Sequence, residues 1–315
     1  MQVVLAEARG LCAGLQRAIE IIETALRQHG SPVYVRRETL HPAHLVDRLR
    51  AKGVRFVDSF AKVPPGSTVI FSPHGVSRTV EQEVEARRLT VVDATCPLIS
   101  KIHADGQRHV RSGGEVVVIG HADHPETEAI LDRLDGHGHL IRTVEDVARL
   151  ELANPGASAY SVQTTLSIDD LRPVLAALRD RFPGILAPDS EAACHAAQHR
   201  QQAVWGLAGM VDLVLVVGAK ASPSCRRLIE IAERRGTRTH LLETPLAFDR
   251  EWLRGVKRVG ITAGLSTHDD LVQDLVETLR NLGAVELWTL PEPKEASDMF
   301  HDPLPPAISA AMGAC

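Results

Sequence analysis

The sequence has few of the features that mark nucleic-acid-binding proteins. Aromatic residues make up only 3% of its 315 residues, so few side chains are available to stack on bases. Lysine and arginine together number 35 against 40 for aspartate and glutamate, and the net charge of −5 gives no basic excess to neutralise phosphate backbones. We therefore expect no nucleic-acid partner.

Long apolar runs are also missing. The nearest candidate, residues 203–219, is interrupted by Gly206, Gly209 and Asp212 and falls short of the roughly 20 apolar residues that span a bilayer. We interpret it as the end of a helix followed by a buried strand. The first ten residues include Glu7 and Arg9 and lack the basic, apolar and small-residue order of a signal peptide, so we expect a cytoplasmic protein with no membrane partner.

The pattern of apolar runs predicts an α/β fold. Short, mostly β-branched runs alternate with helix-length segments, which is typical of parallel α/β units. The expected strands that precede polar loops are Thr68 to Phe71, Val116 to Ile119, Leu213 to Val217 and Val259 to Ile261. Ligands bind at the carboxyl ends of such strands. After the last of these strands, Thr267-His-Asp-Asp predicts a helix over 271–282 that is capped by Thr267.

The five cysteines are odd in number and dispersed, which disfavours a disulfide framework. Cys12, Cys96 and Cys194 fall one in each successive α/β-sized segment, each before a helical stretch, where a thiolate is favoured. The paired spacing of a structural zinc site is missing, whereas three dispersed thiolates suit an iron–sulfur cluster with one iron open to substrate. The alternative is that these are buried, small apolar side chains.

Several polar side chains lie at or near the ends of expected strands, where they suit an anion such as a diphosphate. They are His41, His74, His121, His124, Ser222 and Ser266. Glu126 follows His124 by two residues, and a carboxyl near an anion and a cluster would have a raised pKa suited to proton delivery. Glu126 is equally compatible with a helix N-terminal acid that interacts with the helix dipole.

Six motifs occur in the same order as in one known family. They are Arg9-Gly-Leu-Cys-Ala-Gly14, Phe71-Ser-Pro-His-Gly-Val-Ser77, Asp93-Ala-Thr-Cys-Pro-Leu98, Gly120-His-x-x-His-Pro-Glu126, Gln163-Thr-Thr-Leu-Ser167 and Thr262-Ala-Gly264 with Ser266. Over roughly its first 280 residues the chain resembles the 4-hydroxy-3-methylbut-2-enyl diphosphate reductases, the LytB family. Six ordered motifs are far more specific than a single glycine-rich loop.

The resemblance implies a fold of three similar α/β units in a trefoil around a central 4Fe–4S cluster. It implies that the cluster is held by Cys12, Cys96 and Cys194. The expected parts are a first unit over 14–95, a second over 96–191, a third over 192–283 completed by 1–13, and a C-terminal strand and irregular tail over 284–315.

The resemblance also implies an activity, the reductive dehydration of 4-hydroxy-3-methylbut-2-enyl diphosphate to isopentenyl and dimethylallyl diphosphate. This is the last step of the non-mevalonate isoprenoid pathway. By motif match, the residues that would bind this allylic diphosphate substrate are His41, His74, His124, Thr164, Ser222, Ser224 and Ser266. Of the same motifs, Glu126, His124 and Thr164 would lie near the substrate hydroxyl and relay protons.

The implied reaction needs electrons, a Lewis acid and a proton donor. Cleavage of a carbon–oxygen bond needs a Lewis acid on the leaving oxygen and a proton donor beside it, which the open iron and Glu126 would supply. No G-x-G-x-x-G fingerprint follows any expected strand, so a bound dinucleotide is disfavoured as the electron source. We expect a small redox protein of the ferredoxin or flavodoxin type.

The sequence departs from the family at the diphosphate end and after the third cysteine. Ser222-Pro-Ser224 stands where the family has Ser-x-Asn, and His195-Ala-Ala197 stands where it has Tyr-Ala-Thr. These changes leave open a divergent paralogue with low turnover or a shifted substrate. Two other functions also stay open, a cluster-bearing redox or diphosphate sensor and a plain α/β enzyme with Cys12 as nucleophile. An intact Glu126 motif favours the reductase, because a sensor needs no proton relay.

Overall fold

The computed structural model describes residues 1–36, 43–166, 168–187, 194–284 and 286–291. These residues form two compact units. One contains residues 1–16, 43–48, 195–284 and 286–291, and the other contains residues 17–36, 49–166, 168–187 and 194. All the strand pairs in the described residues are parallel, so the α/β class predicted from the sequence is confirmed.

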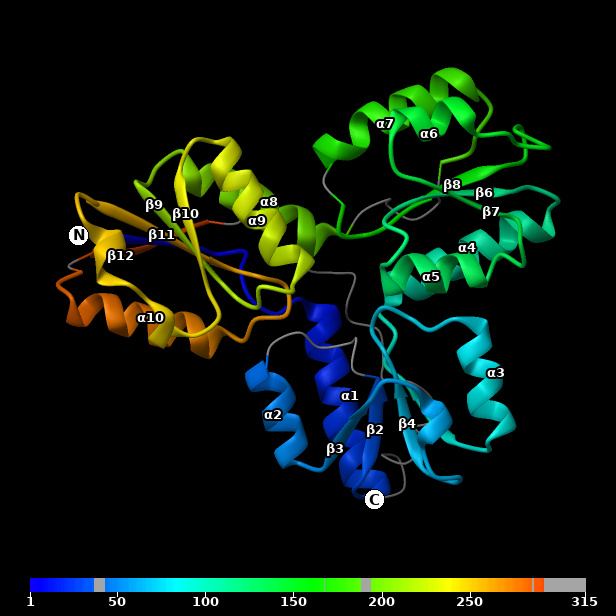
Figure 1. Cartoon of the computed structure of the whole chain (residues 1–315), viewed down its shortest axis with the longest axis horizontal. Helices are drawn as coiled ribbons and strands as arrows, with labels where there is room; N and C mark the ends of the chain where they lie inside the picture. The colour runs from blue at the N-terminus through cyan, green and yellow to red at the C-terminus, as the bar shows by residue number, and fades with distance from the viewer. Residues whose placement is uncertain (37–42, 167, 188–193, 285, 292–315) are drawn as a thin grey trace. The chain divides into compact units, whose positions relative to one another are not determined.

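The first unit is built on a five-stranded sheet in the order β10-β9-β11-β1-β12 (Figure 1). Its strands are β1 (Gln2–Ala6), β9 (Leu213–Val217), β10 (Arg238–Leu242), β11 (Arg258–Ala263) and β12 (Glu286–Leu290). Val214 and Val216 pack with α8 (His195–Ala208) and α9 (Pro223–Arg234), while Leu213 and Leu215 pack with α10 (Asp269–Asn281). Burial on both faces explains why β9 is a continuous apolar run.

The second unit contains two smaller sheets. A four-stranded sheet in the order β3-β2-β4-β5 consists of β2 (Val33–Arg36), β3 (Val54–Val57), β4 (Thr68–Phe71) and β5 (Thr90–Asp93). A three-stranded sheet in the order β7-β6-β8 consists of β6 (Val116–Ile119), β7 (Gly138–Ile141) and β8 (Ala159–Val162). The carboxyl ends of β4 and β5 therefore adjoin, as do those of β6 and β8.

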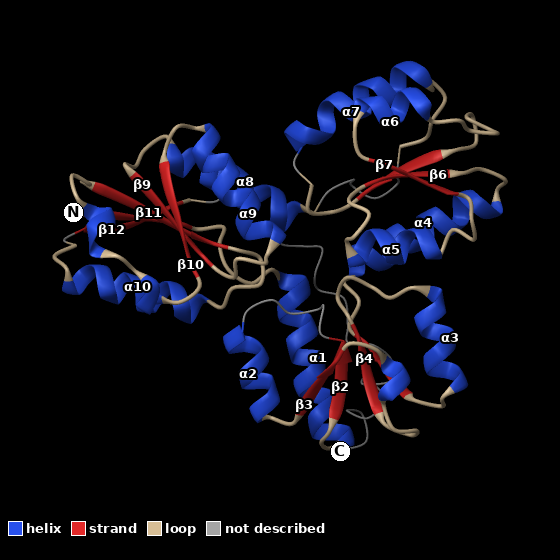
Figure 2. Ribbon diagram, in the orientation of Figure 1, coloured by secondary structure: helices blue, strands red, loops and turns tan. Residues whose placement is uncertain are grey.

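Helices cover both faces of the three-stranded sheet, with α4 (Pro97–Arg111) and α5 (Pro125–Asp132) on one face and α6 (Val144–Arg149) and α7 (Ile168–Arg181) on the other (Figure 2). Helix α3 (Arg78–Ala86) follows β4, and α1 (Ala13–His29) and α2 (Ala43–Ala51) contain residues of both units. The short helices are η2 (Phe60–Lys62), η3 (Pro245–Ala247) and η4 (Arg250–Leu253).

The local predictions hold with one exception. The four expected strands are β4, β6, β9 and β11, and residues 203–219 are the end of α8 followed by β9, as predicted. The prediction that Thr267 caps the last helix is wrong. Helix α10 is capped by His268, whose side chain accepts a hydrogen bond from Asp270 N, because the Thr267 hydroxyl instead donates to Val217 O at 3.1 Å.

Within the described residues, no helix combines the length and the apolar character needed to cross a membrane.

Candidate active site

Glu126 is a fully buried carboxyl in the first turn of α5. One of its oxygens accepts a hydrogen bond from Thr164 N at 2.6 Å, and the other accepts one from Thr164 Oγ1 at 2.9 Å. Burial raises the pKa of Glu126 to about 7, although both hydrogen bonds from Thr164 act to lower it. Both protonation states are therefore accessible near neutral pH, which is what a general acid requires.

Two histidines lie near the start of α5. His124 caps α5, and its Nδ1 accepts a hydrogen bond from Glu126 N at 3.3 Å. A neutral ring that accepts at Nδ1 carries its proton at Nε2. The ring of His74, from the loop after β4, meets the His124 ring edge to face with the centroids 6.0 Å apart. The structure thus brings together four predicted residues: His74, His124, Glu126 and Thr164.

Gln163 holds the loops after β6 and β8 together, although we assigned it no role from the sequence. Its side chain is buried, and its Oε1 accepts from His121 N at 2.9 Å and from Thr127 Oγ1 at 3.4 Å. Its Nε2 donates to Thr165 Oγ1 at 2.7 Å. In the sequence, the only indication of a role was its position in the motif Gln163-Thr-Thr-Leu-Ser167, directly before Thr164.

The three predicted cysteine ligands share one backbone feature. Cys96 N donates to Pro73 O at 3.0 Å, Cys194 N to Thr164 O at 3.2 Å, and Cys12 N to Leu265 O at 3.1 Å. Each acceptor is, or directly adjoins, a predicted substrate contact: Thr164 itself, Pro73 next to His74, and Leu265 next to Ser266. Each cysteine backbone is therefore fixed to a loop that carries a predicted substrate contact.

The chemistry of the donor set fits an iron–sulfur cluster. Cys12, Cys96 and Cys194 are reduced, partly exposed thiols, and the last two pack against the same apolar cluster around α4 and α5. Cys12 Sγ accepts a hydrogen bond from Leu15 N at 3.4 Å. No three His, Cys, Asp or Glu side chains of the described residues could hold one metal ion together. A cluster has a looser requirement, since each thiolate binds a different iron.

Arg200 braces the segment that precedes Cys12. Its buried guanidinium donates to the carbonyl of Gly10 at 2.8 and 3.1 Å, to those of Arg9 and Leu11 at 3.2 Å, and to Ala196 O at 2.7 Å. All these groups belong to the first unit. The sequence placed Arg200 six residues after Cys194 but gave no sign that it binds main-chain carbonyls.

The predicted hydroxyls of the first unit lie in the loops after β9 and β11. Ser222 caps α9, where its Oγ accepts from Cys225 N at 3.4 Å, and it lies 3.0 Å from Ser224 Oγ. Ser224 Oγ also accepts from Leu265 N at 3.2 Å, which ties it to the loop of the buried Ser266. The structure therefore brings these three serines into neighbouring loops. His41 lies outside the described residues.

Cys225 belongs to the core of the first unit. It is fully buried, and its Sγ lies 2.4 and 2.3 Å from where a Cβ would be placed on Gly218 and Gly264. Burial also raises the pKa of its thiol, so it stays protonated. Packing accounts for this cysteine.

Comparison with known proteins gives the family. The model of the LytB protein family matches residues 3–280. A 4-hydroxy-3-methylbut-2-enyl diphosphate reductase from Bordetella pertussis is 48% identical over 308 residues, which cover 98% of this chain and 94% of that protein. A protein of the same name from Zymomonas mobilis is 46% identical over 290 residues, which cover 92% of this chain and 85% of that protein.

Solved structures agree with the sequence relatives. The E-1-hydroxy-2-methyl-but-2-enyl-4-diphosphate reductase from Plasmodium falciparum matches with a TM-score of 0.92 at 28% identity, over 99% of this chain and 98% of that one. An (E)-4-hydroxy-3-methyl-but-2-enyl diphosphate reductase, described as the terminal enzyme of the non-mevalonate pathway, has a TM-score of 0.65 at 30% identity over 89% and 100%. The parallel sheets and their polar strand-end loops define an α/β enzyme. The chain belongs to the LytB family.

Proposed function

We propose that this chain reductively dehydrates 4-hydroxy-3-methylbut-2-enyl diphosphate to isopentenyl and dimethylallyl diphosphate. The observation that carries the proposal is the buried Glu126, whose pKa is raised to about 7 and whose oxygens are both bound by Thr164. A carboxyl in this state supplies a proton at neutral pH. The names of the relatives give the substrate and the reaction type, a reduction.

The cofactor of the proposal is a 4Fe–4S cluster held by Cys12, Cys96 and Cys194, whose donor set fits it. When bound, the cluster would supply single electrons and a Lewis-acidic iron for the substrate hydroxyl. The electrons come from outside the chain, from a small redox protein of the ferredoxin or flavodoxin type.

The proton route follows from which groups can donate and which can accept a hydrogen bond. When Glu126 is protonated, its carboxyl donates to Thr164 Oγ1, and Thr164 then donates to the leaving hydroxyl. Thr164 N stays bound to the other carboxyl oxygen in both protonation states. Because Glu126 is fully buried and Thr164 is slightly exposed, Thr164 delivers the proton and Glu126 stores it. His124 Nε2 donates a hydrogen bond to the same hydroxyl.

The diphosphate is bound by neutral hydroxyls and by histidines. His41, His74, Ser222, Ser224 and Ser266 are assigned this role by motif match. The hydrogen bond between Ser222 and Ser224 uses one of their two hydroxyl protons, so the pair has a single proton left to donate to the anion. A serine and an asparagine, the pair that the family has here, would present more donors.

The test is turnover by the anaerobically reconstituted protein with the allylic diphosphate and a strong one-electron reductant. We expect both isopentenyl and dimethylallyl diphosphate among the products. Tight binding of the substrate to fully reconstituted protein without any turnover would instead identify a diphosphate sensor. Turnover of a different allylic diphosphate alone would identify a paralogue with a shifted substrate.

A further inference from the structure

The loop that carries His74 is fixed at several points of its backbone. Within the loop, His74 N donates to Ser72 Oγ at 3.1 Å and Gly75 N donates to Ser72 O at 2.9 Å. The carbonyl of Pro73 accepts from Cys96 N, as described above. The carbonyl of Val76, further toward α3, accepts a side-chain hydrogen bond from a residue near a helix that covers the three-stranded sheet.

That donor is Arg133, the residue that directly follows α5. Its Nε and Nη2 donate to Val76 O at 3.1 and 2.9 Å, and Nη2 also donates to Glu81 Oε1 at 2.6 Å. The side chain is only 15% exposed. Helix α5 thus carries Glu126 in its first turn, while the residue after its last turn holds the loop of His74.

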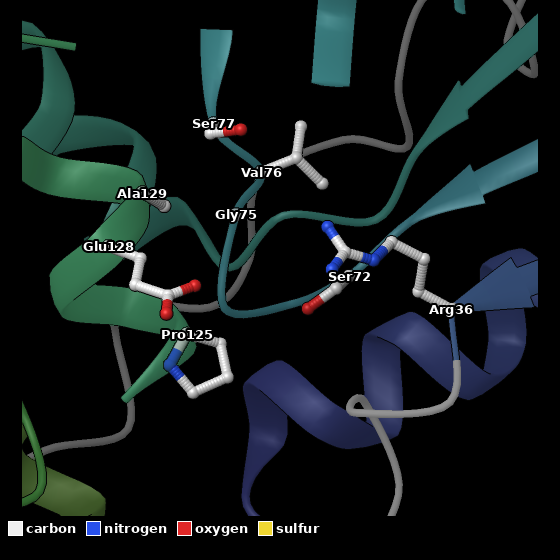
Figure 3. A pocket seen from close by; sticks show the side chains of 8 residues that line it. All are labelled: Arg36, Ser72, Gly75, Val76, Ser77, Pro125, Glu128 and Ala129. Carbon is white, nitrogen blue, oxygen red and sulfur yellow. The ribbon is translucent and has the colours of Figure 1, made fainter. Parts of the chain in front are cut away.

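The loop and α5 also face each other along a pocket (Figure 3). Gly75, Val76 and Ser77 line one side of it, and Pro125 and Glu128 line the other. The pocket separates these side chains locally. The spacing between the His74 loop and the start of α5 therefore depends on contacts elsewhere along the two elements, and Arg133 provides one.

A packing contact holds the same turn from α4. Gly75 has a φ of +79°, and a Cβ there would lie 2.5 Å from His103 Cε1, so the turn is pressed against the His103 ring. Burial and the charge of Arg133 lower the pKa of His103 to about 3. The ring is therefore neutral and packs against the turn, while Arg133 hydrogen-bonds the carbonyl of the next residue, Val76.

We propose that Arg133 is a positioning residue that sets the place of His74 relative to His124 and Glu126. This inference rests on the proposed function, in which His74 binds the diphosphate. Neighbouring contacts between the same elements are more exposed: Arg78 pairs with Asp135 at 3.0 Å with side chains 51% and 61% exposed. Such surface ion pairs contribute little to stability, whereas the Arg133 hydrogen bonds are mostly sheltered from solvent.

The experiment compares Arg133→Gln with Arg78→Gln, which removes a charge from the same contact at its exposed edge. Both variants are made in wild-type protein and in a His74→Ala background. All proteins are assayed at matched iron content and below their unfolding temperatures. We expect Arg133→Gln to raise KM for the allylic diphosphate by about fivefold to tenfold with kcat within about threefold, while Arg78→Gln changes neither. In the His74→Ala background, Arg133→Gln should raise KM by less than about twofold.

The KM measurements and the His74→Ala background distinguish a positioning role of Arg133 from a role in folding alone. Loss of thermal stability alone would leave KM of the folded protein unchanged, and an unchanged KM overturns the proposal. An equal rise of KM in the His74→Ala background also overturns it, because the effect would then not act through His74. Arg133→Lys keeps the charge but loses the planar guanidinium with its two donors, so it should give an intermediate KM. It replaces Arg133→Gln in the experiment if that variant does not fold.

Calorimetric binding of the substrate keeps this proposal distinct from the proposed function. If wild-type protein shows no turnover, the proposed function fails. The same four variants are then compared by their Kd for the substrate, with the same ratios expected. A Kd that depends on His74 but not on Arg133 would overturn the positioning role alone.

Discussion

The two units contribute unlike polar groups to the proposed chemistry. In the second unit, the titratable Glu126 carboxyl is hydrogen-bonded by Thr164 and has no exposed surface. In the first unit, Ser222, Ser224 and Ser266 offer only neutral hydroxyls. The raised pKa of Glu126 depends on complete burial, whereas an anion can be held by several interchangeable donors. Consistent with this difference, Ser224, which stands where the family has an asparagine, is one of these hydroxyls of the first unit.

Both units hold a site loop with an arginine that binds main-chain carbonyls. Arg200 binds the carbonyls of residues 9–11 before Cys12, and Arg133 binds that of Val76 after His74. A guanidinium presents its donors in a planar fork, so one side chain can fix several carbonyls at once. In both units, therefore, the loop geometry depends on a residue outside the motifs that carry the chemistry.

The largest expected effect comes from the cysteines, which belong to both units. Cys12→Ser, Cys96→Ser and Cys194→Ser should each abolish a stable cluster, because a hydroxyl is a poor substitute for a thiolate on iron. Iron and sulfide analysis with visible absorbance after anaerobic reconstitution measures this. Cys225→Ala, a change at the buried thiol of the first unit, is the control and should keep its iron. Full iron content in any of the three serine variants, or stoichiometric zinc in the wild type, would contradict the ligand assignment.

The second effect is on the proton route of the second unit. As proton donor, Glu126 is active in its protonated form, so kcat should fall as the pH rises through its pKa of about 7. Thr164→Val removes a hydrogen bond that lowers this pKa, so the pKa should rise and the fall in kcat should move to higher pH. The variant should also lose about a hundredfold in kcat, since the relay is cut. A kcat profile from pH 5.5 to 9 with an unshifted midpoint would rule out Glu126 as the titrating group.

A third effect concerns the free energy of unfolding, which a substitution of Glu126 should raise rather than lower. The pKa of Glu126 is raised from 4.5 to about 7 on folding, so the wild type loses stability as the pH rises across that interval. Glu126→Gln does not titrate, and its amide keeps hydrogen-bonding capacity toward Thr164. We expect the variant to be more stable than wild type at pH 8, by about 2–4 kcal/mol, and to lose that advantage near pH 4. Denaturant unfolding of the apo-proteins at both pH values is the measurement, and equal pH dependence would refute the raised pKa.

The smallest effect is expected at the hydroxyls of the first unit. Ser224→Asn should restore donors to the loop and strengthen binding of the diphosphate substrate by about threefold to tenfold, the range for one hydrogen bond. Ser222→Ala serves as the comparison and should weaken binding. Substrate titration by calorimetry distinguishes them. If Ser224→Asn binds more weakly than wild type, the bond from Leu265 N to Ser224 matters more than the lost amide.

The sequence predicted the fold class and the strand ends well, because apolar β-branched runs and polar strand-end loops are local signals. It failed at Thr267, where a hydroxyl that suits a helix cap is instead bound to a carbonyl of the neighbouring strand-end, a tertiary contact that no local pattern encodes. Arg133 and Arg200 were missed for the same reason. The loop carbonyls that they bind lie 57 and 189–191 positions away, and backbone groups leave no residue-specific signal. Glu126 and Thr164 were found because family motifs carry them.

The most direct test of the account is the turnover of Glu126→Gln with a cluster content equal to that of the wild type. Proton delivery acts in the transition state more than in binding, so kcat should fall by about a hundredfold or more while substrate affinity stays within about threefold. Single-turnover rates with a strong one-electron donor, together with calorimetric affinity, give both quantities. If the variant turns over at the wild-type rate, Glu126 is not the proton donor, and the second unit does not supply the proton through its buried carboxyl.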